Sequence, residues 1–233
     1  MHIAGLQKLT LLDYPGHTAC TVFTAGCNLR CPFCHNSELV LPQRRPPRMD
    51  EEEFFSFLKK RQGILDGVCI TGGEPLLQKD IADFMQRIKQ LGFAVKLDTN
   101  GCFPHVLRTL VERGLVDYVA MDIKNSRESY AKTVGLENFD LAPVEESVSY
   151  LLSGAVEFEF RTTVVDGLHS ARDFHSIGQW LSGAERYFLQ EFKDSGDVLT
   201  AGLCPPSQEQ LEQFRQIARW YIPNARIRGE SET

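Results

Sequence analysis

The stretch HTACTVFTAGCNLRCPFCHN, residues 17–36, begins as an apolar run typical of a buried strand and ends in three closely spaced cysteines. Cys27, Cys31 and Cys34 are four and three residues apart, a spacing that would place them on one face of a helix. Pro32 disfavours helical geometry at Cys31 and has no amide hydrogen. We therefore expect a loop over 26–36 that wraps its thiolates around a compact metal centre.

Thiolates are soft ligands that suit an iron–sulfur cluster or zinc. Three of them can hold three irons of a cubane cluster and leave the fourth iron open. Zinc is the competing interpretation, because His35 follows Cys34 directly and would complete a Cys3His site. Structural zinc sites usually take their ligands from two separated pairs, whereas these candidates are contiguous in sequence. A zinc-stabilised binding module is the non-enzymatic alternative.

Composition narrows the class of protein and its partners. The 233 residues carry a net charge of -6 with a pI near 5.6, which argues against a general nucleic-acid or anionic-membrane binder. No apolar run is long enough to cross a bilayer, and MHIAGLQKLTLLDYPG does not read as a signal peptide. Seven cysteines, an odd number, fit a reducing compartment. We expect a cytoplasmic protein without nucleic-acid or membrane partners.

Strand-like and helix-like segments alternate along the chain. The strand-like segments are 17–25, 67–71, 93–99, 116–123, 156–165 and 185–192. The helix-like segments are 50–62, 78–91, 103–114, 142–153, 170–182 and 207–221, with Asp50 and Ser207 as expected N-caps. Repeated βα units imply a parallel sheet, as an open partial barrel or a doubly wound sheet. We expect one domain over 1–233, a loop at 41–48 and a flexible tail from about 228 to 233.

In either architecture the ligand site lies at the carboxyl ends of the strands, and polar residues gather there. The expected site residues are Gly72, Gly73 and Glu74 after the second strand, Asp98, Thr99 and Asn100 after the third, Asp122 and Lys124 after the fourth, Arg161 on the fifth and Gln190 on the sixth. Each has an ordinary structural explanation: the glycines suit a tight turn, and Arg161 could pair with Asp122 or Glu74. Cys20 and Cys69 are expected to pack on strands.

The run CNLRCPFC resembles the CxxxCxΦC signature of the radical S-adenosylmethionine (SAM) superfamily, with Phe33 at the aromatic position Φ. The resemblance implies an α/β fold in which a partial (β/α)6 TIM-like barrel of parallel strands is open on one side. It also implies a 4Fe-4S cluster on Cys27, Cys31 and Cys34, whose fourth iron is chelated by SAM. The TGGEP turn resembles the superfamily motif that binds the amino group of SAM.

The DTNG and MDIK strand ends resemble the activating enzymes of glycyl-radical proteins, in which the aspartates and lysine line the SAM site. In some members two aspartates also hold a monovalent cation. The segment GLQKLTLLDYPGHTACTVFTAGCNLRCPFCHN is similar to the anaerobic ribonucleoside-triphosphate reductase activating proteins, in the branch with a DYPG entry and an LQxF sixth strand. The resemblance to this branch extends over nearly the whole chain. The pyruvate formate-lyase activator has a histidine near SAM in the sixth-strand region, where this chain has Gln190.

These resemblances imply an oxidoreductase that cleaves SAM reductively to methionine and a 5'-deoxyadenosyl radical, which then removes a hydrogen atom from a glycine of the reductase. Reduced flavodoxin or ferredoxin would supply the electron. The alternatives are an activase of another glycyl-radical enzyme, of the pyruvate formate-lyase type, and a radical SAM enzyme with a small-molecule substrate. Cys20, Cys69, Cys102 and Cys204 form no second closely spaced set, so an additional ferredoxin-like cluster is not expected.

Overall fold

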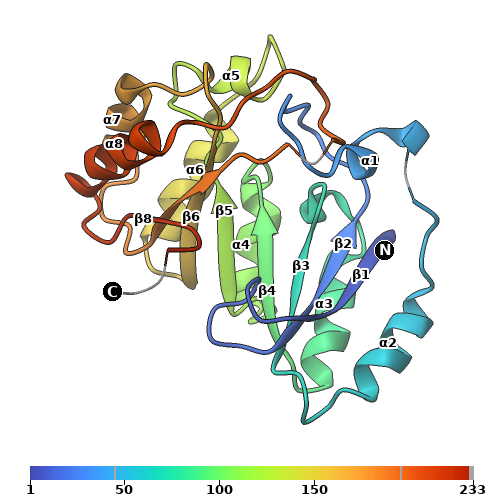
Figure 1. Cartoon of the computed structure of the whole chain (residues 1–233). Helices are drawn as coiled ribbons and strands as arrows, with labels where there is room; N and C mark the ends of the chain where they lie inside the picture. The colour runs from blue at the N-terminus through green and yellow to red at the C-terminus, as the bar shows by residue number, and fades with distance from the viewer. Residues whose placement is uncertain (45, 195, 231–233) are drawn as a thin grey trace.

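A computed structural model, which describes residues 1–44, 46–194 and 196–230, contains one sheet of eight strands (Figure 1). The strands are ordered β1 to β8 as in the sequence; β2 to β8 run parallel, and β1 pairs antiparallel with β2. A doubly wound sheet would reverse its strand order at a switch point. Here the order never reverses, and β1 and β8 form the two edges. The partial barrel with parallel strands and an open side is confirmed.

The strands are β1 Ile3–Thr10, β2 Ala19–Thr24, β3 Gly67–Gly72, β4 Ala94–Thr99, β5 Tyr118–Asp122, β6 Glu157–Val164, β7 Tyr187–Glu191 and β8 Arg226–Ile227. The α-helices are α1 Ser37–Val40, α2 Glu51–Lys59, α3 Ile81–Gln90, α4 Pro104–Glu112, α5 Tyr130–Thr133, α6 Ala142–Leu152, α7 Ala171–Trp180 and α8 Gln208–Arg219. Two 3-10 turns, η1 Pro42–Arg44 and η2 Pro75–Leu77, complete the elements.

The side chains of β2 to β7 alternate between two environments, as strand geometry requires. Residues such as Val22, Ile70 and Leu97 point into the hydrophobic core shared with the helices, which lie on the outer side of the sheet (Figure 1). The alternate positions face the inside of the open barrel, and many of them are polar: Thr21, Cys69, Lys96, Asp98, Tyr118, Asp122, Glu159 and Arg161. The inside of the barrel is therefore built for a polar ligand.

The expected N-caps are confirmed: Asp50 accepts a hydrogen bond from the Glu52 amide, and Ser207 forms a capping box with Gln210. The edge strands β1 and β8 were not predicted, because one is exposed over Gln7–Leu9 and the other has two residues. The part of the expected tail at 231–233 lies outside the described residues. In the described part of the chain, helices are all too short or too polar to cross a membrane.

Candidate functional site

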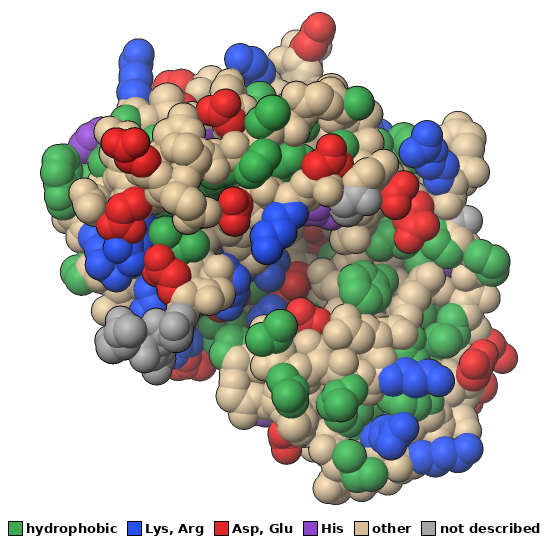
Figure 2. All heavy atoms as spheres, viewed as in Figure 1, with side chains coloured by type: hydrophobic (Ala, Val, Ile, Leu, Met, Phe, Trp, Pro, Cys, Tyr) green, Lys and Arg blue, Asp and Glu red, His purple; other side chains and the backbone are tan. Residues whose placement is uncertain are grey.

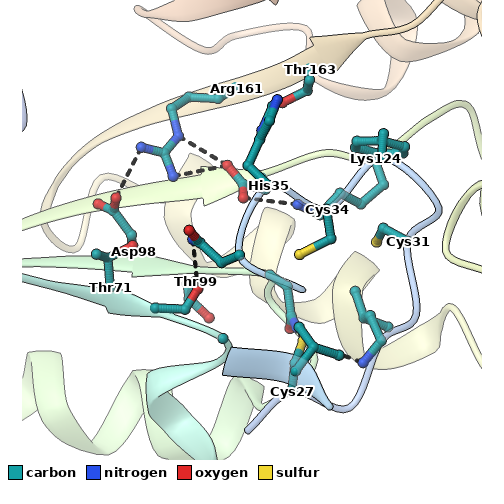
Figure 3. A pocket seen from close by; sticks show the side chains of 18 of the residues that line it. Cys27, Cys31, Cys34, His35, Thr71, Asp98, Thr99, Lys124, Arg161 and Thr163 are labelled. Atoms are coloured by element: carbon teal, nitrogen blue, oxygen red, sulfur yellow. Dashed lines mark hydrogen bonds and ion pairs between the residues drawn. The ribbon is translucent and has the colours of Figure 1, made fainter. Parts of the chain in front are cut away.

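A cavity of about 230 Å³ lies at the carboxyl ends of the strands, between the cysteine loop and the ends of β3 to β7 (Figure 3). Every expected site residue except Glu74 lines it: Cys27, Cys31, Phe33, Cys34, Gly72, Gly73, Asp98, Thr99, Asn100, Asp122, Lys124, Arg161 and Gln190. Lining residues that the sequence did not single out as cavity residues are Leu29, His35, Asn36, Val40, Thr71 and Thr163. Strand ends distant in sequence thus converge with one loop.

The three cysteines lie on an irregular loop, as expected from Pro32, and all are free thiols that turn toward the cavity (Figure 3). Burial raises the pKa of Cys27 to about 11 and that of Cys31 to about 12. Buried thiolates therefore need a compensating positive charge, which a bound metal centre supplies. Within the described ranges, no three His, Cys, Asp or Glu side chains are close enough to hold one metal ion. The donor set suits a cluster of several soft metal atoms.

Segments from much later in the chain hold this loop in place. The amide of Arg30 donates to the Val134 carbonyl at 3.0 Å, and the amide of Thr200 donates to the Pro32 carbonyl at 3.0 Å. His35 contacts the Lys193 carbonyl at 2.6 Å and stacks on Phe192. His35 thus packs the loop against the segment after β7.

The Gly72–Gly73 turn lies against the start of the cysteine loop. Gly72 has a φ of +124°, and a Cβ there would lie 2.2 Å from the Thr24 amide nitrogen. A Cβ on Gly73 would lie 2.0 Å from the Gly26 carbonyl oxygen, which accepts a hydrogen bond from the Glu74 amide at 2.7 Å. Both glycines are required because two backbones meet here.

Gly73→Ala is expected to push the turn away from the cysteine loop, since the clash is with rigid backbone. We expect a loss of about 1–3 kcal/mol in the free energy of unfolding, the usual cost of overpacking. Denaturant unfolding of the metal-free protein measures this loss. The control is Gly5→Ala, because Gly5, like Gly73, has no positive φ and its added Cβ would make only ordinary contacts, the nearest 3.6 Å from the Phe23 ring. Equal losses in the two variants would contradict the backbone-clash explanation.

Glu74 is fully buried, and its carboxylate lies behind the cavity wall. It accepts hydrogen bonds from the Leu76 amide at 3.0 Å, the Thr99 hydroxyl at 2.8 Å and the Asn100 amide at 2.7 Å. These bonds tie the end of β3 to the end of β4. The contact with the amino group of SAM that the resemblance assigns to Glu74 stays a prediction.

Burial raises the pKa of Glu74 to about 7 from an ordinary value of 4.5, against its three hydrogen bonds. The folded chain thus holds a proton that the unfolded chain has released, so the stability from protonated Glu74 is present below pH 4.5 and lost as the pH rises through about 7. Relative to Glu74→Gln, the free energy of unfolding of the metal-free wild type should fall by about 3 kcal/mol as the pH rises from 4.5 to above 7. Denaturant unfolding at several pH values checks this, and a constant difference would contradict it.

Five charged side chains alternate in sign across the barrel, and we call them the charged row: Lys96, Asp98, Arg161, Asp122 and Lys124. Arg161 donates to Asp98 at 3.1 Å and to Asp122 at 2.9 Å (Figure 3). Lys124 donates to the other oxygen of Asp122 at 2.9 Å, and Lys96 pairs with Asp98. Arg161 therefore pairs with Asp122 as the structural explanation foresaw, and with Asp98 in place of Glu74.

Charge pairing outweighs burial in the charged row. Burial alone would raise the pKa of Asp122, but Arg161 and Lys124 hold it well below its usual range. Arg161 and Lys96 likewise lower the pKa of Asp98 against its burial, so both aspartates are ionised at neutral pH. The guanidinium of Arg161 lies between these two carboxylates. Binding of a monovalent cation, which some activating enzymes hold on two aspartates, stays a prediction. Lys96 was missed; the signal was a lysine two residues before Asp98, on the same face of β4.

The model of the radical SAM superfamily matches residues 21–170. A protein of Methanocaldococcus jannaschii, named as a glycyl-radical enzyme activating enzyme, is 33% identical to the chain over 97% of this chain and 95% of its own length. The pyruvate formate-lyase 1-activating enzyme of Escherichia coli K12 is 26% identical over 94% of this chain and 95% of its own length.

Among solved structures, a domain of the pyruvate-formate lyase-activating enzyme from Bacteroides vulgatus matches with a TM-score of 0.57 and 20% identity. The match covers 70% of this chain and 99% of that domain. At this identity the likeness concerns the fold alone, and it agrees with the open barrel described above.

Proposed function

This chain belongs to the radical SAM superfamily, whose members use a 4Fe-4S cluster on three cysteines together with SAM, and from this premise we propose that it activates a glycyl-radical enzyme. The observation that carries the proposal is that three free thiols share one cavity with four members of the charged row, Asp98, Asp122, Lys124 and Arg161. The relative from Methanocaldococcus jannaschii, alike over nearly its whole length, supports the activase assignment.

In this proposal Cys27, Cys31 and Cys34 hold the cluster, and SAM binds against the ends of β3 to β7. When bound, cluster and SAM supply one-electron reductive cleavage to methionine and a 5'-deoxyadenosyl radical, which removes a hydrogen atom from the substrate glycine. Lys124 presents an ammonium group to the carboxylate of SAM. Arg161 holds Asp98 and Asp122 in fixed orientations, and Phe33, which is buried, keeps water from this end of the cavity.

The open side of the barrel gives a protein substrate room to approach. β1 and β8 are the unclosed edges, and Figure 2 shows a hollow in the middle of the viewed face, with charged side chains inside it. A loop of a partner enzyme can carry its glycine toward such an opening. This geometry favours a protein substrate over a small molecule, for which a closed site would serve better.

We propose anaerobic ribonucleoside-triphosphate reductase as the partner, with reduced flavodoxin or ferredoxin as the electron donor. The support is the N-terminal likeness around DYPG, residues 13–16, and the glutamine at position 190. Gln190 lines the cavity, at the strand where the pyruvate formate-lyase activator is expected to place a histidine.

The test is electron paramagnetic resonance on anaerobically reconstituted protein mixed with SAM, reductant and one of several glycyl-radical enzymes. A glycine-centred signal is expected with the anaerobic reductase and absent when its acceptor glycine is replaced by alanine. A signal only with pyruvate formate-lyase would reassign the partner. SAM cleavage without a signal from any partner would favour a small-molecule substrate, and zinc without iron or sulfide would favour the binding module.

A further inference from the structure

The segment 124–136, which we call the α5 segment, connects the two halves of the site. Its first residue, Lys124, extends into the cavity and pairs with Asp122. Its far end supports the cysteine loop: Val134 accepts from the Arg30 amide, and a Cβ on Gly135 would lie 2.3 Å from the Arg30 carbonyl oxygen. The segment therefore contacts both halves of the site, the charged row through Lys124 and the cysteine loop through Val134 and Gly135.

His169, just before α7, holds the backbone of Lys124. The amide of Val165 donates to Nδ1 of His169 at 3.1 Å, so this nitrogen carries no proton. The proton is then on Nε2, which donates to the Lys124 carbonyl at 2.9 Å. His169 is 6% exposed, and its burial lowers its pKa, so the ring stays neutral at pH 7. Both ring nitrogens thus bind backbone groups, which fixes the ring between two segments.

The start of α7 also holds the next residues of the segment. One oxygen of Asp173 accepts from the hydroxyls of Ser126 at 2.6 Å and Ser129 at 2.9 Å. Asn125 donates to the Leu168 carbonyl at 2.9 Å. Polar contacts therefore fix the α5 segment. The hydrogen bond from His169 holds Lys124, the residue of this segment that lines the cavity.

We propose that His169 is a positioning residue that acts through Lys124: it fixes the backbone from which the ammonium group reaches Asp122 and the bound SAM. This inference rests on the proposed place of Lys124 in the SAM site. An ordinary core histidine, which satisfies two backbone groups and nothing more, makes a different prediction. Its loss would destabilise the fold without depending on whether Lys124 is present.

A double-mutant cycle on reconstituted holoenzyme separates these explanations, with equilibrium SAM binding as the readout and no partner enzyme present. His169→Phe is expected to weaken SAM binding about tenfold, as is usual for residues that orient a ligand group, while iron content stays at the wild-type level. Lys124→Gln should weaken binding at least as much. The double variant should bind no more weakly than Lys124→Gln alone, because His169 acts through the lysine.

Two further variants complete the design. His169→Gln, which keeps a donor and an acceptor, should restore binding to within about twofold of the wild type. His175→Phe is the matched control on α7; its ring contacts the Tyr221 hydroxyl and lies beside Trp220, and we expect wild-type binding. If His169→Phe does not fold, the smaller His169→Leu takes its place in the cycle.

Independent, multiplying losses in the double variant, or no loss in His169→Phe, would overturn the positioning role. These outcomes are separate from failure of the proposed function. That failure would appear as a wild-type holoenzyme that binds SAM but yields no glycine-centred signal with any partner.

Discussion

Replacing Arg161 with methionine is expected to lower the free energy of unfolding by about 1–3 kcal/mol, because two largely buried carboxylates each lose a hydrogen-bond partner. Arg161 is the central member of the charged row, and its side chain is 12% exposed. Its loss leaves Asp98 with Lys96 alone and Asp122 with Lys124 alone. Denaturant unfolding of the metal-free protein at pH 7 measures the effect, and SAM binding to the holoenzyme should weaken as well.

The matched control is Arg186→Met. Arg186 pairs with Glu157 at 2.9 Å, but both side chains are well exposed. Exposed pairs contribute about 0–1 kcal/mol, so the control should lose less stability. The stability loss in Arg161→Lys should lie between those of the two methionine variants. Lysine keeps the positive charge but lacks the planar guanidinium that reaches two carboxylates. If Arg161→Met and Arg186→Met lost similar stability, the charged row would not support the fold as described.

Cys31→Ala is expected to abolish cluster binding and with it all SAM cleavage. The remaining Cys27 and Cys34 provide two of the three thiolates that the cluster needs, and burial disfavours their ionisation without a metal. Iron and sulfide analysis of anaerobically reconstituted protein, with measurement of 5'-deoxyadenosine release, checks both effects. Iron near zero and product at background are the expected values.

Cys204→Ala serves as the control, because Cys204 is an exposed free thiol away from the cavity lining. It should retain the iron content and product release of the wild type. A Cys31→Ala protein that kept its iron would show that this thiol is not a ligand. Loss of iron in Cys204→Ala instead would point to a different set of cysteines.

The sequence predicted the parallel sheet and most of the cavity for one physical reason. Parallel strands bring their carboxyl ends to one edge of the sheet, so polar residues at those ends, such as Asp98 and Asp122, had to meet. The cysteine loop was predicted from Pro32 and the spacing of its thiols. Little tertiary information was needed for either inference.

Other features depend on contacts that no local pattern encodes. The carboxylate of Glu74 turns behind the cavity wall because the Thr99 hydroxyl and the Asn100 amide attract it there. Lys96 lies two residues before its partner Asp98 on one face of β4, but that this face turns into the barrel and buries the lysine depends on the tertiary fold. β1 was missed because an edge strand that is partly exposed lacks the buried pattern of a central one.

The contacts of the cysteine loop determine when, during synthesis, the loop can form. The strands are neighbours in sequence order, so the sheet can assemble progressively from its N-terminal end as the chain emerges from the ribosome. The groups that hold the cysteine loop emerge much later than the loop itself. They are the Val134 carbonyl, which binds Arg30, the Lys193 carbonyl, which binds His35, and the amide of Thr200. The cysteines are made before these partners, so we expect them to reach their final arrangement only after Thr200 has been translated. We therefore expect metal insertion to follow the synthesis of these segments.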